Sequence, residues 1–324
     1  MAKAYLTSAV QQAFYEEMKR DASVVVFGED VKVSPYGYLR GLYEEFGSER
    51  VRNTPISENT LAGAAVGAAV CGLRPVVDLM TGNFLYTGMD QIANQAAKLC
   101  YMTGGQLNIP VVFIVVMGGG SNIAAQHSDS PHPVFMNLGG LKVVVPTTPA
   151  DAKGLVKSAV RDDDPVMLLI PSACLGSKGE VPEGQDFTIP FGVADVKREG
   201  GDVTIVGIGS MLKQALLAAE TLAEEDISAE VIDPRTLNPL DSKCILDSVA
   251  KTGRLVVVDE SRRLCSAASE IAAVVSEEAF DDLKAPVRRV TVPNVPMPFS
   301  PPLEKFVRPG ADEIVSAAKW VAAY

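Results

Sequence analysis

The sequence contains two histidines, and both lie in one polar loop. His127 and His132 belong to the segment AQHSDSPH, which follows the apolar block Val111–Met117 and the turn Gly118–Gly120. An imidazole exchanges protons near neutral pH, and catalytic side chains are often found on loops that follow core strands. A hydrogen-bonded surface histidine is the alternative interpretation. The spacing does not suit metal binding by one helix, and no third ligand lies nearby, so a zinc site is not predicted.

Glu58 is the second candidate for chemistry. It lies in NTPISEN, directly before the nearly uncharged segment AGAAVGAAVCG (62–72). A carboxylate at this place could simply interact with the positive end of a helix. It could also be desolvated enough to keep its proton and donate a hydrogen bond. Small residues at helical spacing allow close backbone approach, so we expect the helix to pack against a neighbour, which could be a second subunit.

Two glycine clusters invite a phosphate-binding interpretation. They are Gly118–Asn122 and Gly207–Ser210, and each follows an apolar block. Neither completes a dinucleotide-binding or P-loop pattern. Turns between a strand and a helix need glycine for backbone reasons alone, so a nucleotide site is not predicted.

The elements that must position these residues alternate between strand and helix. Apolar blocks bounded by turn residues recur from Val24–Phe27 to Val166–Ile170, with helix-compatible stretches between them. This alternation predicts an α/β fold with a mostly parallel sheet. A second strand–helix series runs from Val203–Ile208 to Val287–Val292. We therefore predict a first domain at residues 1–185, a linker rich in Gly, Pro and charge at 186–200, and a second α/β domain at 201–324.

Composition excludes several classes of partner. The 324 residues carry a net charge of −11, with 47% hydrophobic and 21% charged residues, which argues against nucleic acid or an anionic membrane surface as a partner. No apolar run is long enough to span a bilayer, and Glu16 and Glu17 interrupt the place of a signal-peptide core. Five scattered cysteines without a CxxC pair predict reduced, mostly buried thiols in the cytoplasm.

Several segments together resemble one enzyme family. They are TPISENTLAGAAVGAAVCGLRPVVDLMTGNF, DQIANQAAK, AQHSDS, GLKVVVPTTPADAKGLVKSAVRDDDPV, DPRTLNPLD, KTGRLVVVDE and VPMPFSPPLEKFVRP. The sequence resembles the β subunit of the E1 component of 2-oxo acid dehydrogenase complexes, and it is similar to the acetoin dehydrogenase β subunit. The resemblance implies a thiamine diphosphate-binding, pyrimidine-type domain followed by a transketolase C-terminal-like α/β domain. It also implies an oxidoreductase that is active only as an α2β2 heterotetramer with an E1 α subunit.

The resemblance assigns roles to four residues. Glu58 matches the glutamate that hydrogen-bonds N1′ of the aminopyrimidine of thiamine diphosphate and thereby promotes formation of the C2 ylid. Phe84 matches the aromatic residue that packs on the pyrimidine, and Met80 lies beside it. His127 matches the histidine that handles protons near the reacting carbon. The motif GDG with its asparagines, which holds Mg²⁺ and diphosphate in this family, is absent from the sequence, so the α partner is expected to supply it.

The resemblance also implies a cation site, and the sequence differs from the family pattern in one loop. Val111, Ala159, Asp162 and Asp164 match positions whose oxygens surround a structural monovalent cation, K⁺, in related chains. Residues 129–139 depart from the family pattern, with His132 as an additional histidine. The acceptor side of the site is therefore expected to differ more than the cofactor side.

The sequence analysis thus favours a thiamine diphosphate-dependent E1 β subunit. With its α partner it would decarboxylate a 2-oxo acid, or cleave acetoin, and transfer the acyl group to a lipoyl-bearing E2 acyltransferase. Two alternatives remain open: a non-oxidative thiamine-dependent lyase or transferase subunit, and a non-catalytic β-like assembly subunit.

Overall fold

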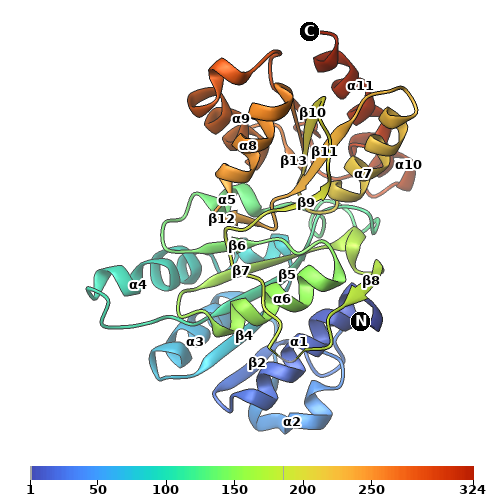
Figure 1. The fold of residues 1–324 in the computed structure, drawn as a ribbon. Helices are drawn as coiled ribbons and strands as arrows, with labels where there is room; N and C mark the ends of the chain where they lie inside the picture. The colour runs from blue at the N-terminus through green and yellow to red at the C-terminus, as the bar shows by residue number, and fades with distance from the viewer. Residues whose placement is uncertain (1, 185) are drawn as a thin grey trace. The chain divides into compact units, whose positions relative to one another are not determined.

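The computed structural model describes residues 2–184 and 186–324. The chain divides into two compact parts, and each is described by itself (Figure 1). The first part comprises residues up to 117 together with 134–191, and the second comprises 118–133 together with 192–324. The loop that contains both histidines therefore belongs to the second part, although strands of the first part flank it in the sequence.

The first part is built on a parallel sheet. Its elements are β1 (Ala2–Tyr5), α1 (Leu6–Arg20), β2 (Val24–Glu29), α2 (Leu42–Arg50), β3 (Val51–Thr54), α3 (Glu58–Val70), β4 (Arg74–Thr81), η1 (Gly82–Tyr86), η2 (Gln91–Ala96), α4 (Ala97–Met102), β5 (Val112–Met117), β6 (Lys142–Val144), α6 (Pro149–Arg161), β7 (Val166–Pro171), η3 (Ser172–Cys174) and β8 (Lys178–Val181). Six of its strands run in the order β6-β7-β5-β4-β2-β3. All of their pairings are parallel, so their carboxyl ends meet at one edge, where a site is expected.

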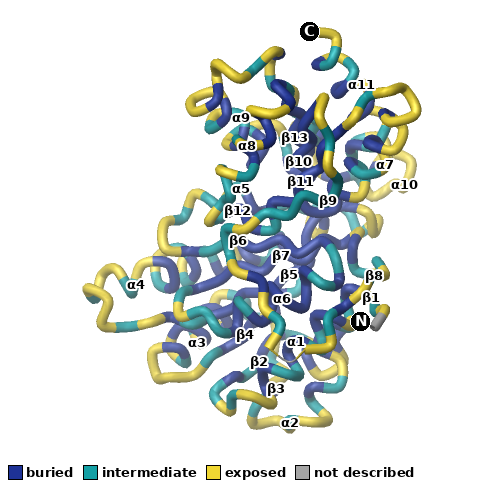
Figure 2. The backbone as a smooth tube through the Cα atoms, viewed as in Figure 1, coloured by how far each residue is buried: buried dark blue, intermediate teal, exposed yellow. Residues whose placement is uncertain are grey.

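Alternating side chains cover both faces of this sheet. Val24, Val76 and Val112 point into a core shared with α1 and α6, whereas Val25 and Phe27 point to the side of α3. Figure 2 shows the strands as the buried layer of this part. Charged pairs reinforce the contact between α1 and α6, because Glu17 accepts from Arg161 at 2.6 Å. The continuous apolar runs predicted as strands are thus explained by burial on two sides.

The second part is a smaller α/β unit. Its elements are β9 (Asp195–Arg198), β10 (Val203–Gly207), α7 (Met211–Ala223), β11 (Ala229–Asp233), β12 (Thr236–Asn238), α8 (Ser242–Thr252), β13 (Leu255–Arg262), α9 (Ala267–Glu278), η4 (Phe280–Asp282), β14 (Arg288–Val292), α10 (Pro301–Val307) and α11 (Ala311–Ala322), and α5 (His132–Met136) runs across the division of the chain. The sheet order is β14-β13-β10-β11-β9, with β9 antiparallel. Helices α7 and α11 pack on one face through an apolar core.

The α/β class and the strand–helix series predicted from the sequence are confirmed. Two details differ from the predictions. β9 lies within the range 186–200 that we predicted as a linker, because Asp195–Arg198 pairs with the edge of β11. The prediction that the cysteines are mostly buried was wrong: all five are free, but only Cys174 is buried, whereas Cys71 and Cys265 are exposed.

None of the helices in the described residues is both long enough and apolar enough to cross a membrane.

Gly140 tests how tightly the first part is packed. Its φ is +89°, and a Cβ atom there would collide with the backbone carbonyl oxygen of Ala97. We expect Gly140→Ala to lower the free energy of unfolding by about 3 kcal/mol, because overpacking and left-handed backbone strain add. Thermal unfolding followed by circular dichroism measures this loss.

The neighbouring glycine provides the control. A Cβ atom at Gly139 would meet no atom within 4 Å, and the residue has no left-handed φ, so Gly139→Ala should leave the melting midpoint nearly unchanged. Equal midpoints for the two variants would contradict the packing described for Gly140.

Candidate functional site

Glu58 is the first residue of α3, at the edge where the parallel strands of the first part end. Ser57 precedes the helix without a side-chain cap, and the Glu58 side chain is half-buried. Glu29, at the end of β2, lies close enough to Glu58 for the two carboxylates to interact electrostatically. Burial raises the pKa of Glu29, and the charges of Asp30 and Glu58 raise it further. Three carboxylates, those of Glu29, Asp30 and Glu58, thus lie near one another at this edge.

Asp78 is a buried acid within the same sheet. Its Oδ1 accepts from the hydroxyl of Tyr38 at 2.9 Å and from the backbone N–H of Met80 at 2.9 Å. Burial raises the pKa of Asp78 to about 7, Glu29 adds to the rise, and the two hydrogen bonds oppose it. The turn that Asp78 holds gives Met80 a left-handed φ of +64°. Met80 therefore lies at the register shift between Asp78 and Thr81, near the carboxyl end of β4.

Phe84 follows on η1, directly after β4. Its side chain is half-buried, like that of Met80. The next segment packs on the start of α3, because a Cβ atom at Gly88 would lie 3.2 Å from the backbone oxygen of Glu58. Glu58, Met80 and Phe84, which the sequence analysis predicted as cofactor contacts, therefore lie at one edge of one sheet.

Two hydroxyl groups at the strand ends lack partners. The Oγ1 atoms of Thr54, at the end of β3, and Thr81, at the end of β4, are buried and make no hydrogen bond to any described residue. Buried polar atoms are normally paired. The edge therefore offers donors and acceptors that a polar ring could satisfy.

A largely apolar cavity of about 450 Å³ lies beside α3. It is bounded by β2, β3 and α3, and its walls include Phe27, Thr54, Ser57 and Ala64. The helix buries Leu61, Ala62, Ala65, Val66 and Ala69, but its small residues Ala64 and Gly67 are exposed. The expected helix of small residues is thus covered on one side only within this chain.

His127 lies in the second part, on a turn of the loop 118–133. Its side chain is exposed, and its backbone N–H donates to the carbonyl of Ala124 at 3.2 Å. Ala124 has a left-handed φ of +66°, a conformation that costs free energy for a residue with a Cβ. Strained loops of this kind are concentrated at functional sites.

The predicted cation ligands lie on the opposite side of the first sheet, where strands begin. The carbonyl of Val111 accepts from the N–H of Val166 at 2.8 Å, and the carboxylates of Asp162 and Asp164 accept from Lys142 at 2.7 and 3.0 Å. The carbonyl of Asp162 accepts from Arg74 at 2.9 Å. Ala159 is buried in α6. Asp162 and Asp164 therefore already interact with cationic side chains of this chain, Lys142 and Arg74.

Sequence reasoning did not single out Tyr38, Glu29, Asp78 or Asp259. One signal was available, because Asp78 interrupts the buried run Val76–Leu79 and a charged residue inside a buried strand is rarely there without a partner. Its partner Tyr38 lies 40 residues earlier, and no local pattern connects them. Within residues 2–184 and 186–324, no group of three or more His, Cys, Asp or Glu side chains could hold a metal ion.

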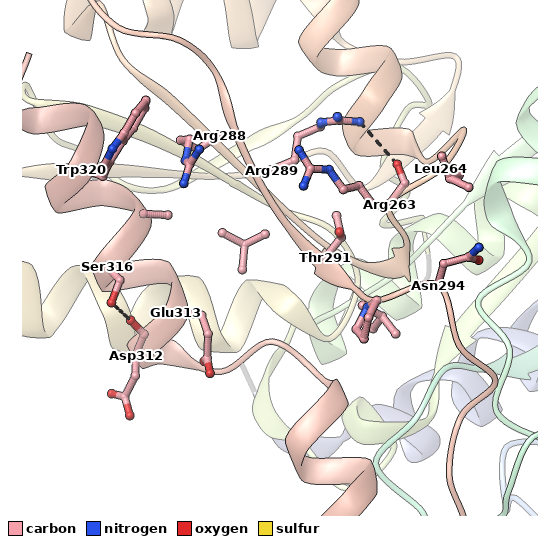
Figure 3. Close-up of a pocket in the computed structure, with 14 residues that line it drawn as sticks. Arg263, Leu264, Arg288, Arg289, Thr291, Asn294, Asp312, Glu313, Ser316 and Trp320 are labelled. Carbon is pink, nitrogen blue, oxygen red and sulfur yellow. Dashed lines mark hydrogen bonds between the residues drawn. The ribbon is translucent and has the colours of Figure 1, made fainter.

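The second part contains a separate pocket of about 890 Å³ between β14 and α11 (Figure 3). Arg263 and Arg289 lie side by side on one wall, and Asp312 and Glu313 lie on the other. The guanidinium of Arg288 packs over the ring of Trp320 at 4.2 Å. None of the predicted site residues lines this pocket.

Comparison with known families matches both parts. Residues 2–176 match the transketolase pyrimidine-binding domain, and residues 192–314 match the transketolase C-terminal domain. A solved structure described as a split-gene transketolase, inactive β4 tetramer, aligns with a TM-score of 0.81 and 28% identity over 98% of each chain. Both matches and the shared fold thus define a transketolase-type protein.

Relatives narrow this class. Subunit β of acetoin:2,6-dichlorophenolindophenol oxidoreductase from Cupriavidus necator is 46% identical over 96% of this chain and 95% of its own. Subunit β of 2-oxoisovalerate dehydrogenase from Bacillus subtilis is 42% identical over 98% of both. The chain belongs to the family of E1 β subunits of the thiamine diphosphate-dependent 2-oxo acid and acetoin dehydrogenases. The resemblance stated from the sequence is confirmed.

Asp78 makes the stability of the first part depend on pH. Its pKa in the folded chain is about 7, above the value of about 3.9 for an unperturbed aspartate. The folded state therefore binds this proton more tightly, and the free energy of unfolding falls as the pH rises from about 4 to about 7. Asp78→Asn removes this titration while its amide oxygen still accepts from Tyr38 and Met80. We expect the variant to gain stability relative to the wild type as the pH rises, by up to about 1.4 kcal/mol per unit of pKa shift.

Melting midpoints at pH 5, 6.5 and 8 measure this change. The test is whether the difference in melting midpoint between variant and wild type changes with pH. A difference that is the same at every pH reports only the effect of replacing the carboxyl group with an amide. Parallel midpoint curves would show that Asp78 does not titrate in this range.

Proposed function

We propose that the chain is the β half of a thiamine diphosphate-dependent active site that acts on a 2-oxo acid or acetoin. The observation that carries the proposal is the position of Glu58, half-buried at the first turn of α3 and near Glu29. Among relatives of similar identity, one is named for acetoin and one for 2-oxoisovalerate. We therefore propose a specific class of reaction but leave open which of these substrates the chain acts on.

The residues at the edge of the first sheet fit an aminopyrimidine. The unpartnered hydroxyls of Thr54 and Thr81 supply polar groups, while Met80 and Phe84 supply half-buried apolar surface on which a flat ring can pack. The close packing of Gly88 on the start of α3 leaves Glu58 at the rim of this surface. The donor set therefore suits a flat ring with a nitrogen at its edge.

Glu58 would hold the proton at N1′ of that ring. Thiamine diphosphate supplies a nucleophilic carbon that attacks the substrate carbonyl. For this chemistry the carboxyl of Glu58 must share a proton with the ring nitrogen. His127 would transfer protons at the substrate, since an imidazole titrates near neutral pH.

An E1 α subunit would complete the site. The described residues hold no cluster of metal-ligating side chains, and we infer that Mg²⁺ and diphosphate are bound by the partner in an α2β2 heterotetramer. The exposed small residues of α3 and the adjoining apolar cavity would receive it. A K⁺ ion at Val111, Ala159, Asp162 and Asp164 remains a prediction, and Lys142 and Arg74 already bind to Asp162 there.

A lipoyl-bearing E2 acyltransferase is the proposed acceptor of the acyl group. The loop that departs from the family pattern, residues 129–139, includes His132 within the second part. Product analysis on the reconstituted complex distinguishes acyl transfer to a lipoyl domain from release of a free aldehyde or acyloin.

Glu58→Gln tests the proposed role of the carboxyl. In the complex reconstituted with the α subunit, we expect turnover with thiamine diphosphate to fall by a factor of about 10² or more, because loss of a general acid–base group has an effect of this size. Turnover is measured with acetoin or 2-oxoisovalerate and 2,6-dichlorophenolindophenol as electron acceptor. The melting midpoint should change little, since Glu58 is only half-buried and lies at the end of its helix.

The matched control is Glu44→Gln. Glu44 also lies in the first turn of a helix of the first part, α2, but its side chain is exposed. It should retain wild-type turnover. Near-normal turnover of Glu58→Gln would refute the assignment of this residue.

Gly67→Leu tests the proposed partner surface. A Cβ atom at Gly67 meets no atom within 4 Å, so the isolated chain should tolerate the larger side chain with an unchanged melting midpoint. If the exposed side of α3 packs against the α subunit, the leucine will block close approach. We expect co-purification with tagged α subunit to be lost.

Gly176→Leu is the control, because Gly176 also has open space around a Cβ position and lies in a turn of the same part. An unchanged yield of complex from Gly67→Leu would place the α subunit on another surface.

A further inference from the structure

His132 is a buried residue that the proposed chemistry does not use. It stands between Pro131 and Pro133 at the end of the loop 118–133, and its side chain is 0% exposed. Its Nε2 lies 3.0 Å from Oδ1 of Asp259, which is also 0% exposed. Both residues belong to the second part. A buried histidine paired with a carboxylate is an anchor whose charge is little screened by salt.

The hydrogen bonds of Asp259 favour its ionised carboxylate. Its Oδ1 also accepts from the N–H of Ser261 at 2.8 Å, and its Oδ2 accepts from the hydroxyl of Ser261 at 2.7 Å. Burial by itself would raise the pKa of Asp259, but the charge and hydrogen bond of His132 and the hydrogen bonds of Ser261 hold the pKa below its usual value. The carboxylate therefore needs a donor from the loop to remain buried.

The loop does not favour its conformation by itself. Asn122 and Ala124 adopt left-handed φ values of +54° and +66°, and this conformation is costly for an alanine, although an asparagine tolerates it. Within the described chain, Ser128 Oγ, Ser130 Oγ and His132 Nδ1 are buried without a hydrogen-bond partner. Each such atom has lost its water without compensation. Contacts with the rest of the second part must outweigh these costs.

Three contacts of the loop with that part involve charged side chains. Asp129 binds Arg262 at 2.8 Å, but the Arg262 side chain is 36% exposed. The N–H of Gly120 donates to Glu304. Of these three contacts, the pair of His132 and Asp259 is the one in which both side chains are fully buried. Removing one partner of a buried pair strongly destabilises a protein.

The place of this anchor in the sheet is also significant. β10 lies between β11 and β13, and the chain runs from β10 to β11 and then returns to β13, so the winding reverses between β10 and β13. Open α/β sheets bind ligands at the carboxyl ends of such strands. Here Asp259, near the end of β13, binds the chain's own loop instead.

We propose that His132 is a positioning residue: its pair with Asp259 holds the loop 118–133, and with it His127, in the conformation that the reaction requires. The role of His127 in this proposal rests on the proposed function. The proposal that His132 holds the loop in place does not depend on that function. His132 provides the loop with one buried donor, and Pro131 and Pro133 restrict the backbone on either side.

Hydrogen–deuterium exchange on the reconstituted complex tests the holding of the loop. His132→Phe keeps a ring but removes the donor, whereas His132→Gln keeps a side-chain N–H that can reach Asp259. We expect amides of residues 120–130 to exchange about tenfold faster in His132→Phe and within about twofold of wild type in His132→Gln, because local opening sets the exchange rate. Amides of α7 should not change.

Kinetics with 2,6-dichlorophenolindophenol test the positioning of His127. His132→Phe should lower kcat about tenfold or more with little change in KM for the substrate, since the loss lies in the reacting arrangement. His132→Gln should restore most of kcat. His127→Ala should lower kcat without altering exchange of the loop, and this result separates the two proposals. If His127→Ala is fully active, the role of His127 fails while the exchange result still decides the role of His132.

A double variant covers the case in which His132→Phe does not fold because Asp259 is left unpaired. His132→Phe with Asp259→Asn removes the buried charge but not the defect in holding the loop, so fast exchange of residues 120–130 should persist. Wild-type exchange in a folded variant that lacks the donor, or a loss of kcat that His132→Gln does not restore, would overturn the proposal.

Discussion

A carboxylate at the end of a parallel strand is the constraint on which both parts of the chain depend. Asp78 accepts from the N–H of Met80, Asp233 from that of Arg235 and Asp259 from that of Ser261. In each case the aspartate closes a turn two residues later, directly at the carboxyl edge of its sheet. At Asp78 and Asp259 the turn shifts the register of the ladder, which resumes at Thr81 in β4 and at Arg262 in β13; at Asp233 the strand β11 ends.

The remaining parts of the site follow from these turns. Met80 has a left-handed backbone within β4 because Asp78 binds its N–H, and η1 with Phe84 starts two residues later. In the second part, the turn after Asp259 leaves its carboxylate free to accept from His132 as well. Each aspartate is buried, so its charge must be neutralised by a proton or by a partner. Asp78 uses a proton with a pKa of about 7, and Asp259 uses His132.

Local sequence patterns predicted the elements but not these partnerships. The apolar blocks of β2, β4, β5 and β7 were identifiable because strands buried on two sides read as continuous runs. Glu58 was identifiable from its place before the small-residue helix and from the family resemblance. The bond from Tyr38 to Asp78 spans 40 residues and that from His132 to Asp259 spans 127, so neither leaves a local signal. β9 lay hidden in a segment rich in Gly and charge because an edge strand needs little apolar character.

The division of the chain has a consequence for how it is made. Residues 118–133 belong to the second part, yet the ribosome synthesises His132 127 residues before its partner Asp259. During translation, which proceeds from the N-terminus, the strands on either side of this loop, β5 and β6, can each pair with β7 before Asp259 has been synthesised. The segment that carries both histidines is thus the last piece of the N-terminal half to reach its final conformation, and nascent chains expose it to chaperones and proteases until the second sheet has formed.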